Sequence, residues 1–158
     1  MATGPGNQQT GQAGEHFVAA ELNRRGAYAV TFAGNMPKID ILASNHDRTR
    51  TVSIQVKTRR TGTWHASIDD GRKCKTTSKE THFWVFVDIE NVNAPPTYYI
   101  VPLWWIQNNI YETHNTYLAK HGGSRAKNPN SKHHGIDPKR IIQWKERWNI
   151  LKLFENES

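Results

Sequence analysis

Polar side chains interrupt two apolar runs in the stretch PKIDILASNHDRTRTVSIQVKTRR, residues 37–60. Asp40 lies in the first run, and Gln55 and Lys57 lie in the second. A carboxylate beside an amide carbonyl offers the hard oxygen ligands that Mg²⁺ prefers. A divalent ion held there can bind a phosphate oxygen and lower the pKa of a bound water, and a neighbouring lysine can orient that water or offset charge on the phosphate. These residue types therefore suit the hydrolysis of phosphodiester bonds.

A β-hairpin would bring these three side chains onto one face. Residues 51–58 alternate apolar and polar side chains, which is the pattern of a strand with one buried face. If the turn is centred between residues 47 and 48, Asp40 lies opposite Gln55 and Lys38 lies opposite Lys57. Side chains directly opposite each other in an antiparallel pair share a face. A slip of one residue would separate the group, so the prediction depends on that register.

Glu15 is a second acid, and a helix would point it inward. Residues 12–25 predict a helix that is ended by a glycine. Apolar residues follow Glu15 at spacings of three, four and seven residues (Val18, Ala19 and Leu22), which places Glu15 on the buried side of the first turn. One explanation is an acid that meets the positive end of the helix dipole. The other is an acid directed into a site, where it could add an oxygen ligand.

The rest of the pattern predicts one mixed α/β domain. Extended segments are predicted at residues 27–32, 39–43, 51–58, 63–67, 82–89 and 97–101, and helices at 102–111 and 115–120. Residues 122–135 read as a glycine-rich loop, and Asp137 followed by Pro138 predicts a helix start. The last apolar segment, RWNILKLF, either extends that helix or forms a final strand. Residues 1–10 predict a flexible leader, so the domain comprises residues 11–158.

The basic residues of the chain are clustered. The formal net charge is +7 over 158 residues. Residues 57–79 contain seven basic and two acidic residues, and residues 120–140 contain six basic and one acidic residue. This clustering suits a polyanionic partner, and we expect DNA, although an unspecialised basic surface or a solvated strand end is the alternative. The predicted contacts to the nucleic-acid backbone are Arg59, Arg60, Arg72, Lys73, Lys75, Arg125, Lys127 and Lys132.

Several other classes of site lack the residues that they need. The one cysteine, Cys74, excludes an internal disulfide and a cysteine-based zinc site. With a single cysteine and no apolar run long enough to cross a bilayer, we expect a reducing, cytoplasmic setting and no membrane partner. His133 and His134 lack a nearby acid or cysteine to complete a metal site or an HNH-type nuclease finger. Trp64 and His65, which follow the predicted strand of residues 51–58, suit either packing or a substrate contact.

The order of the candidate residues resembles the PD-(D/E)XK nuclease superfamily. In that pattern a helix acid is followed by a strand acid and then by acid-x-lysine on the next strand. Glu15, Asp40 and Gln55-Val56-Lys57 stand at those positions. The opening GxxGE, followed by VAAEL and a glycine, is similar to the start of archaeal Holliday-junction resolvases and related small nucleases. The resemblance covers residues 11–60, with HFWVFVDI as a continuation, and leaves residues 102–158 unassigned.

The resemblance implies a restriction-endonuclease-like fold, in which helices flank a mixed β-sheet with one metal-binding corner. It also implies a DNA endonuclease that uses Mg²⁺ or Mn²⁺. Asp40 would be the central metal ligand, Lys57 the catalytic lysine and Glu15 the helix acid. Val56 would offer its backbone carbonyl to the metal. Many enzymes with this core act as dimers, so a homodimer is a further expectation.

Gln55 departs from the pattern, which has Glu or Asp at that position. A glutamine carbonyl can ligate a metal but brings no negative charge, so the site should depend more on Glu15 or on phosphate oxygens. Pro37 is also too far from Asp40 to form the PD dipeptide. A catalytically weak or inactive nucleic-acid-binding module on the same fold is therefore the alternative. Asp40 could likewise be an ordinary hairpin acid paired with Lys38 or Lys57.

Overall fold

The structure is a computed structural model that describes residues 6–125 and 127–155, except for the side chains of residues 33–35. Its helices are α1 (Asn7–Arg24) and α2 (Leu103–Lys120), and three short 3₁₀ helices are η1 (Ile68–Asp70), η2 (Pro138–Trp144) and η3 (Trp148–Leu151). Its strands are β1 (Tyr28–Met36), β2 (Ile39–Ser44), β3 (Thr51–Arg59), β4 (Trp64–Ser67), β5 (His82–Asp88), β6 (Thr97–Pro102) and β7 (His133–Ile136).

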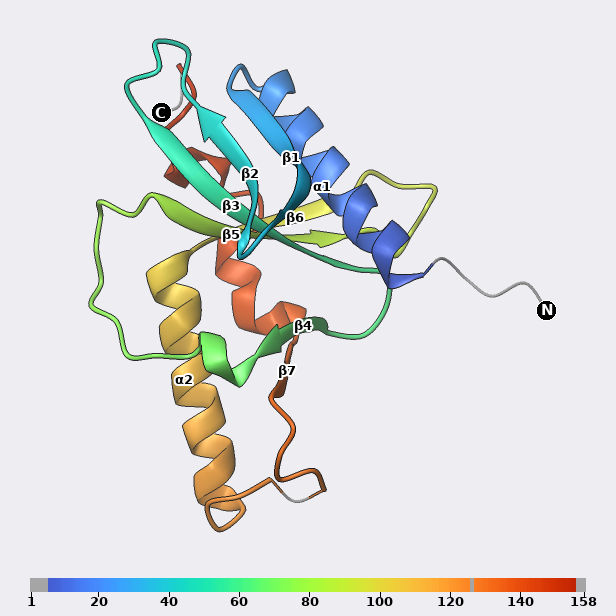
Figure 1. Ribbon diagram of the computed structural model, residues 1–158, viewed down its shortest axis with the longest axis vertical. Helices are drawn as coiled ribbons and strands as arrows, with labels where there is room; N and C mark the ends of the chain where they lie inside the picture. Colours follow the sequence, from blue (N-terminus) through green and yellow to red (C-terminus); the bar gives the residue numbers. More distant parts are fainter. Residues whose placement is uncertain (1–5, 126, 156–158) are drawn as a thin grey trace, which may run out of the picture.

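Five strands form the main sheet, in the order β1-β2-β3-β5-β6 (Figure 1). β3 and β5 are parallel, and the other neighbouring pairs are antiparallel. A separate two-stranded sheet is formed by β4 and β7. This small sheet lies beside α2, below the main sheet in Figure 1. The predicted fold class, a single α/β domain with a mixed sheet flanked by helices, is confirmed.

Each face of the main sheet has its own core. On one face α1 covers the sheet, and its Val18 and Leu22 are fully buried against Ile41 and Ile54. On the other face α2 and the small sheet bury a second cluster, which includes Trp64, Trp84, Phe86, Ile106 and Ile136. Each such side chain, when fully buried, contributes about 1.5–3 kcal/mol. The buried face predicted for the first helix is therefore the face that α1 presents to the sheet.

The register predicted for the β2–β3 hairpin is confirmed. Ile41 pairs with Ile54, and the pairing continues to Ser44 and Thr51, which centres the turn between residues 47 and 48. The ladder between β2 and β3 ends at Ile41, however, while the ladder between β1 and β2 continues to the pair of Met36 with Ile39. Lys38 lies in the tight β1–β2 turn with a φ of 63°. The ladder between β2 and β3 therefore includes neither the predicted pair of Asp40 with Gln55 nor the predicted pair of Lys38 with Lys57.

Other boundaries differ from the predictions. α1 begins at Asn7, so residues 7–10 of the predicted leader are helical, while residues 1–5 lie outside the described residues. α2 is one helix rather than two, since no glycine or proline interrupts residues 103–120. β7 overlaps the end of the predicted 122–135 loop, because His133–Ile136 becomes a strand only by pairing with β4. Pro138 does begin a helix, of 3₁₀ type, and Asp137 caps it by accepting the Lys139 N–H at 2.8 Å.

Gly14 allows α1 to approach β3 closely. A Cβ atom at this position would lie 1.7 Å from the hydroxyl oxygen of Thr58. Any larger residue would therefore push the helix away from the strand. Glu15 follows directly in the sequence, so the same close approach sets how near its carboxyl group comes to β2 and β3.

We expect Gly14→Ala to destabilise the fold by about 1–3 kcal/mol, the usual cost of overpacking a tight contact. The measurement is the free energy of unfolding in urea. Gly11→Ala is the matched control, because its Cβ would meet nothing within 4 Å and alanine favours a helix over glycine by roughly 0.5–1 kcal/mol. Equal stability of the two variants would contradict the close packing of α1 on β3.

Candidate active site

Asp40 lies at the point where β2 leaves β3. Its Oδ2 accepts a hydrogen bond from the Val56 N–H at 2.7 Å. The carboxylate therefore takes the place of a backbone acceptor that the ladder no longer supplies. The N–H and C=O of one strand residue face the same neighbour, so the Val56 carbonyl also faces this open edge. A half-buried carboxylate and a backbone carbonyl are thereby directed to one place.

Glu15 reaches the same place from α1. Burial raises the pKa of the Glu15 carboxyl above its ordinary value of 4.5, and the negative charge of Asp40 and a side-chain hydrogen bond with Asp40 raise this pKa further. A cation bound between the two groups would relieve the repulsion of their negative charges.

Lys57 approaches from the opposite face of the sheet. Its amine nitrogen lies 4.9 Å from the centre of the Trp84 ring, within the range of a cation–π contact. Burial lowers the pKa of the Lys57 amine, and the negative charges of Asp70 and then Asp40 act in the opposite direction. Lys57 is thus a partly desolvated amine on which the negative charges of Asp70 and Asp40 act.

Gln55 lines a cavity of about 360 Å³ beside these residues. Ser53, Trp84 and Leu103 form part of the wall, and Asp70, Arg72 and Gln107 add polar groups. The structure thus brings Gln55 to the edge of the candidate site, where its neighbour across the cavity is an acid that the motif did not include. The sequence contained a signal for this acid, since Asp69 and Asp70 are the only acids of the basic segment 57–79.

The donor set at the open edge fits a divalent cation. The Glu15 and Asp40 carboxyl groups and the backbone edge at Val56 supply oxygen, which is the ligand type that Mg²⁺ and Mn²⁺ prefer. Among the residues that the structure describes, no three His, Cys, Asp or Glu side chains are grouped so that they could hold a metal ion. Such a site would therefore need oxygens from the amide of Gln55, from the backbone or from a substrate phosphate.

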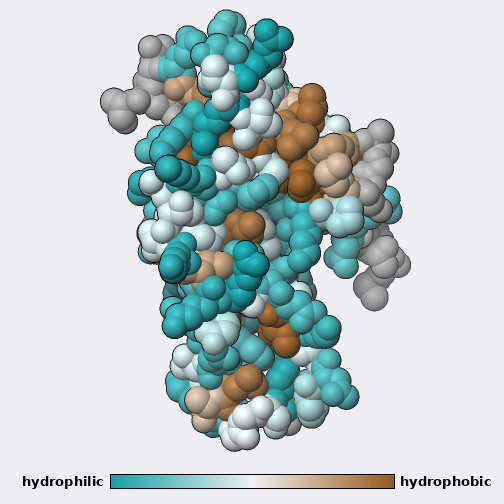
Figure 2. Space-filling model, turned by 60° about the vertical axis from the view of Figure 1, so that its left-hand side comes forward, coloured by the Kyte–Doolittle hydropathy of each residue, from teal (hydrophilic) through white to brown (hydrophobic). Residues whose placement is uncertain are grey.

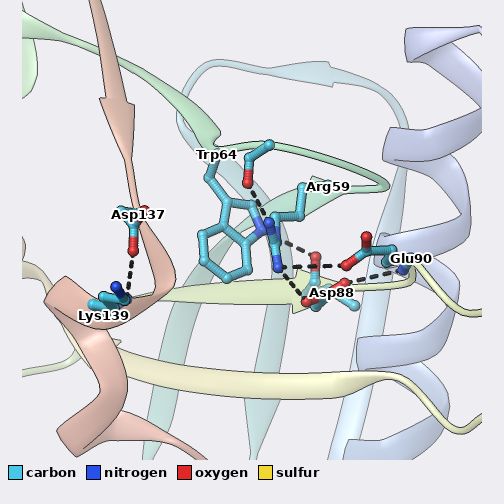
Figure 3. Close-up of polar contacts among 8 residues, drawn as sticks. Arg59, Trp64, Asp88, Glu90, Asp137 and Lys139 are labelled. Atoms are coloured by element: carbon cyan, nitrogen blue, oxygen red, sulfur yellow. Dashed lines mark hydrogen bonds and ion pairs between the residues drawn. The ribbon is translucent and has the colours of Figure 1, made fainter.

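Arg59 occupies a structural position (Figure 3). Its side chain is only 13% exposed, and its guanidinium forms ion pairs with Asp88 at 2.6 Å and with Glu90 at 3.9 Å. It also lies 4.8 Å from the centre of the Trp64 ring. Trp64 is fully buried, and its indole N–H donates to the Val87 carbonyl at 3.0 Å. The surroundings of Arg59 therefore do not support the predicted DNA contact, and Trp64 is a core residue.

The other predicted backbone contacts fall into two groups. Three of them bond to their own surroundings: Arg60 donates to Thr10 at 2.8 Å, Arg125 donates to two carbonyls of its own loop, and Lys132 pairs with Asp69 at 2.8 Å. The other four are exposed, as Lys132 also is, namely Arg72, Lys73, Lys75 and Lys127. The first three of these follow η1 in residues 71–81, which form no helix or strand. Hydrophilic residues predominate on the face drawn in Figure 2, where hydrophobic ones form small separate groups.

The histidines of β7 lie on opposite faces of the strand. The ring of His133 is exposed, and its Nδ1 lies 3.3 Å from Nδ1 of His65 on β4. His134 is buried, and burial together with nearby positive charge, first that of Arg140, lowers the pKa of its ring to about 4.

The described part of the chain also contains no helix whose length and apolar character would let it cross a membrane.

The raised pKa of Glu15 predicts a pH-dependent stability. A carboxyl group whose pKa is higher in the folded state stabilises that state fully below the unfolded value of 4.5, and this contribution is lost as the pH rises through the folded value. In EDTA, the melting temperature of the wild type should therefore fall relative to that of Glu15→Gln as the pH rises from 4 to 8. Glu112→Gln, on the exposed part of α2, is the control. Parallel curves for the wild type and Glu15→Gln would contradict the carboxyl pair.

Comparison with known proteins relates the fold to two nucleases. The Holliday junction resolvase Hjc of Archaeoglobus fulgidus is 16% identical over 92% of this chain and 98% of its own, with a TM-score of 0.53. The bacterial homing endonuclease I-Ssp6803I is 12% identical over 93% of this chain and 92% of its own, with a TM-score of 0.51. No protein-family model and no curated protein sequence matches the chain. The fold is therefore restriction-endonuclease-like, and the likeness extends into residues 102–158.

Proposed function

We propose that this protein is a metal-dependent DNA endonuclease of the PD-(D/E)XK type. The observation that carries the proposal is the meeting of Glu15 and Asp40 at an open strand edge, with Lys57 close by. The fold adds support, because the two similar structures are a junction resolvase and a homing endonuclease. The proposed reaction is hydrolysis of a phosphodiester bond in DNA.

Asp40 and Glu15 would hold Mg²⁺ or Mn²⁺, together with the backbone carbonyl of Val56 and the amide oxygen of Gln55. The ion would act as a Lewis acid that offsets charge on a phosphate and makes a water easier to deprotonate. The hydrogen bond from Val56 fixes the Asp40 carboxylate before any ligand arrives. The close packing of α1 at Gly14 fixes the approach of Glu15 in the same way.

Lys57 would act on the reacting phosphate or on the attacking water. Its amine is partly desolvated, so its interaction with a phosphate oxygen is stronger than that of an exposed lysine. The lowered pKa also makes the neutral amine, which can accept a proton, easier to reach. The Trp84 ring beneath the amine limits where it can move.

The DNA backbone would follow the exposed residues Arg72, Lys73 and Lys75. Arg72 lines the cavity beside Gln55, so this segment joins the candidate site to an open basic surface. Lys127 would add a contact from the loop before β7. A homodimer would place two such sites on the two strands of a duplex, and we propose it on that ground. A cytoplasmic setting remains an expectation from the sequence.

The alternative function is a nucleic-acid-binding module with weak or lost catalysis. The observation that favours it is the neutral amide of Gln55 at a position where the nuclease pattern has an acid. Both functions require binding to DNA, so binding alone does not distinguish them. Cleavage that depends on the metal and on the site residues does.

The decisive test compares cleavage of supercoiled plasmid and branched DNA in Mg²⁺, Mn²⁺ and EDTA. We expect cleavage in at least one metal and none in EDTA. Asp40→Asn, whose amide oxygen can still accept from Val56, and Lys57→Met should each lower the rate by about 100-fold or more. Melting curves of the variants show whether they remain folded. DNA binding without cleavage in either metal would overturn the endonuclease and leave the binding module.

A second test concerns the basic segment. Replacing Lys73 and Lys75 together by glutamine should weaken DNA binding and reduce the slope of log K against log salt concentration by about 0.9 for each phosphate that the protein no longer neutralises. Fluorescence anisotropy with a labelled duplex measures both quantities. Arg24→Gln is the matched control, because Arg24 is 80% exposed at the far end of α1. A slope that the double variant leaves unchanged would remove this segment from the DNA interface.

A further inference from the structure

Gln55 leaves a negative charge missing from the candidate site. In the motif that the sequence resembles, an acid stands two residues before the lysine, whereas this chain has an amide there. An amide can offer a carbonyl oxygen but cannot balance a cation. Lys57 and a bound divalent ion would together bring three positive charges to this corner, so a further carboxylate nearby would be favoured.

Asp70 provides a carboxylate in the wall of the cavity that Gln55 lines. Gln55 and Asp70 both line this space of about 360 Å³. Asp70 belongs to η1, which follows β4 directly. Its side chain is 16% exposed, and its Oδ1 lies 3.6 Å from the amine of Lys38. It is thus a carboxylate that is largely withdrawn from solvent and faces the candidate site from a neighbouring element.

The backbone holds Asp70 in place. Its Oδ2 accepts the Ser67 N–H at 3.2 Å, and the Ser67 hydroxyl accepts the Asp69 N–H at 3.1 Å, which together form a capping box at the start of η1. Asp69 lines the same cavity, but its carboxylate pairs with Lys132 at 2.8 Å and its side chain is 60% exposed. Of the two adjacent acids, Asp70 is the one whose carboxylate is anchored by the backbone and largely withdrawn from solvent. Its charge is also the largest attractive one that acts on the Lys57 amine, ahead of that of Asp40.

We propose that Asp70 is a positioning residue that supplies, from η1, the negative charge that Gln55 does not bring to the site. It holds the Lys57 ammonium group near the cavity and favours the approach of a divalent cation. This inference rests on the proposed endonuclease function. A purely structural Asp70 would cap η1 and pair with the exposed amine of Lys38. Asparagine keeps the cap because its amide oxygen accepts the same hydrogen bond, and an exposed ion pair contributes little to stability.

The test removes the negative charge of residue 70 and then adds one at residue 55. Asp70→Asn should lower kcat on the cleaved DNA about tenfold or more and change KM by less than about threefold, since one charge acts on the reacting groups rather than on DNA binding. Adding Gln55→Glu to that variant should restore at least half of the loss on a logarithmic scale. Asp69→Asn, which removes an equal charge at an exposed position, should stay within about twofold of the wild type.

A second readout uses the metal alone. Titration of each variant with Mn²⁺, followed by the rise in melting temperature, should show weaker binding in Asp70→Asn and recovery in the double variant. Melting temperatures in EDTA should be similar for all four proteins. If the wild type is active and Asp70→Asn behaves as Asp69→Asn does, the inference is wrong while the endonuclease stands. The same holds if Gln55→Glu does not restore the activity that Asp70→Asn loses. A wild type that cleaves no DNA in either metal overturns the endonuclease and the inference together.

Discussion

The hydrogen bond from the Val56 N–H to the Asp40 carboxylate is the contact on which the candidate site depends. β2 pairs with β3 only as far as Ile41, and it then turns back into β1. A half-buried backbone N–H that loses its ladder partner needs another acceptor. Asp40 provides it, so the acid stabilises the divergence of the two strands and is itself fixed by it. A carboxylate and a backbone edge are therefore exposed together at a rigid place in the sheet.

Residues from both faces of the main sheet contribute to the candidate site. Glu15 comes from the helix that covers one face, while Lys57 extends toward Trp84 in the cluster on the other face. Burial acts on both residues and disfavours their charged forms, which raises the pKa of Glu15 and lowers the pKa of Lys57. In the proposed function, a divalent cation would compensate the carboxyl pair and a phosphate would compensate the ammonium. Binding of the metal and of the phosphodiester would therefore each relieve an unfavourable electrostatic energy of the unliganded site.

The sequence was informative where local pattern decides the structure. Alternation in residues 51–58 and the short polar tip were sufficient for the hairpin register, and the spacing around Glu15 was sufficient for its inward face. The tight turn at Lys38 was not predictable, because a left-handed residue there depends on the pairing of Met36 with Ile39. β7 was missed for a similar reason, since a glycine-rich segment becomes a strand only against β4. The exposure of Arg59 could not be judged from its charge, because its partners lie 29 and 31 positions away.

The role of Arg59 explains how an acid outside the motif can act in the site. Arg59 and Trp64 stand at the two ends of the short turn from β3 to β4, and both are fixed to β5 and the residues just after it, through Asp88, Glu90 and the Val87 carbonyl (Figure 3). This arrangement determines the direction in which β4 leaves the main sheet, and η1 with Asp70 follows β4 without a break. A basic residue that the sequence suggested as a DNA contact therefore helps to set where Asp70 stands. In the proposed arrangement, η1 as well as β3 can thus supply negative charge near Lys57, because β3 and the segment that leads to η1 are both anchored to β5.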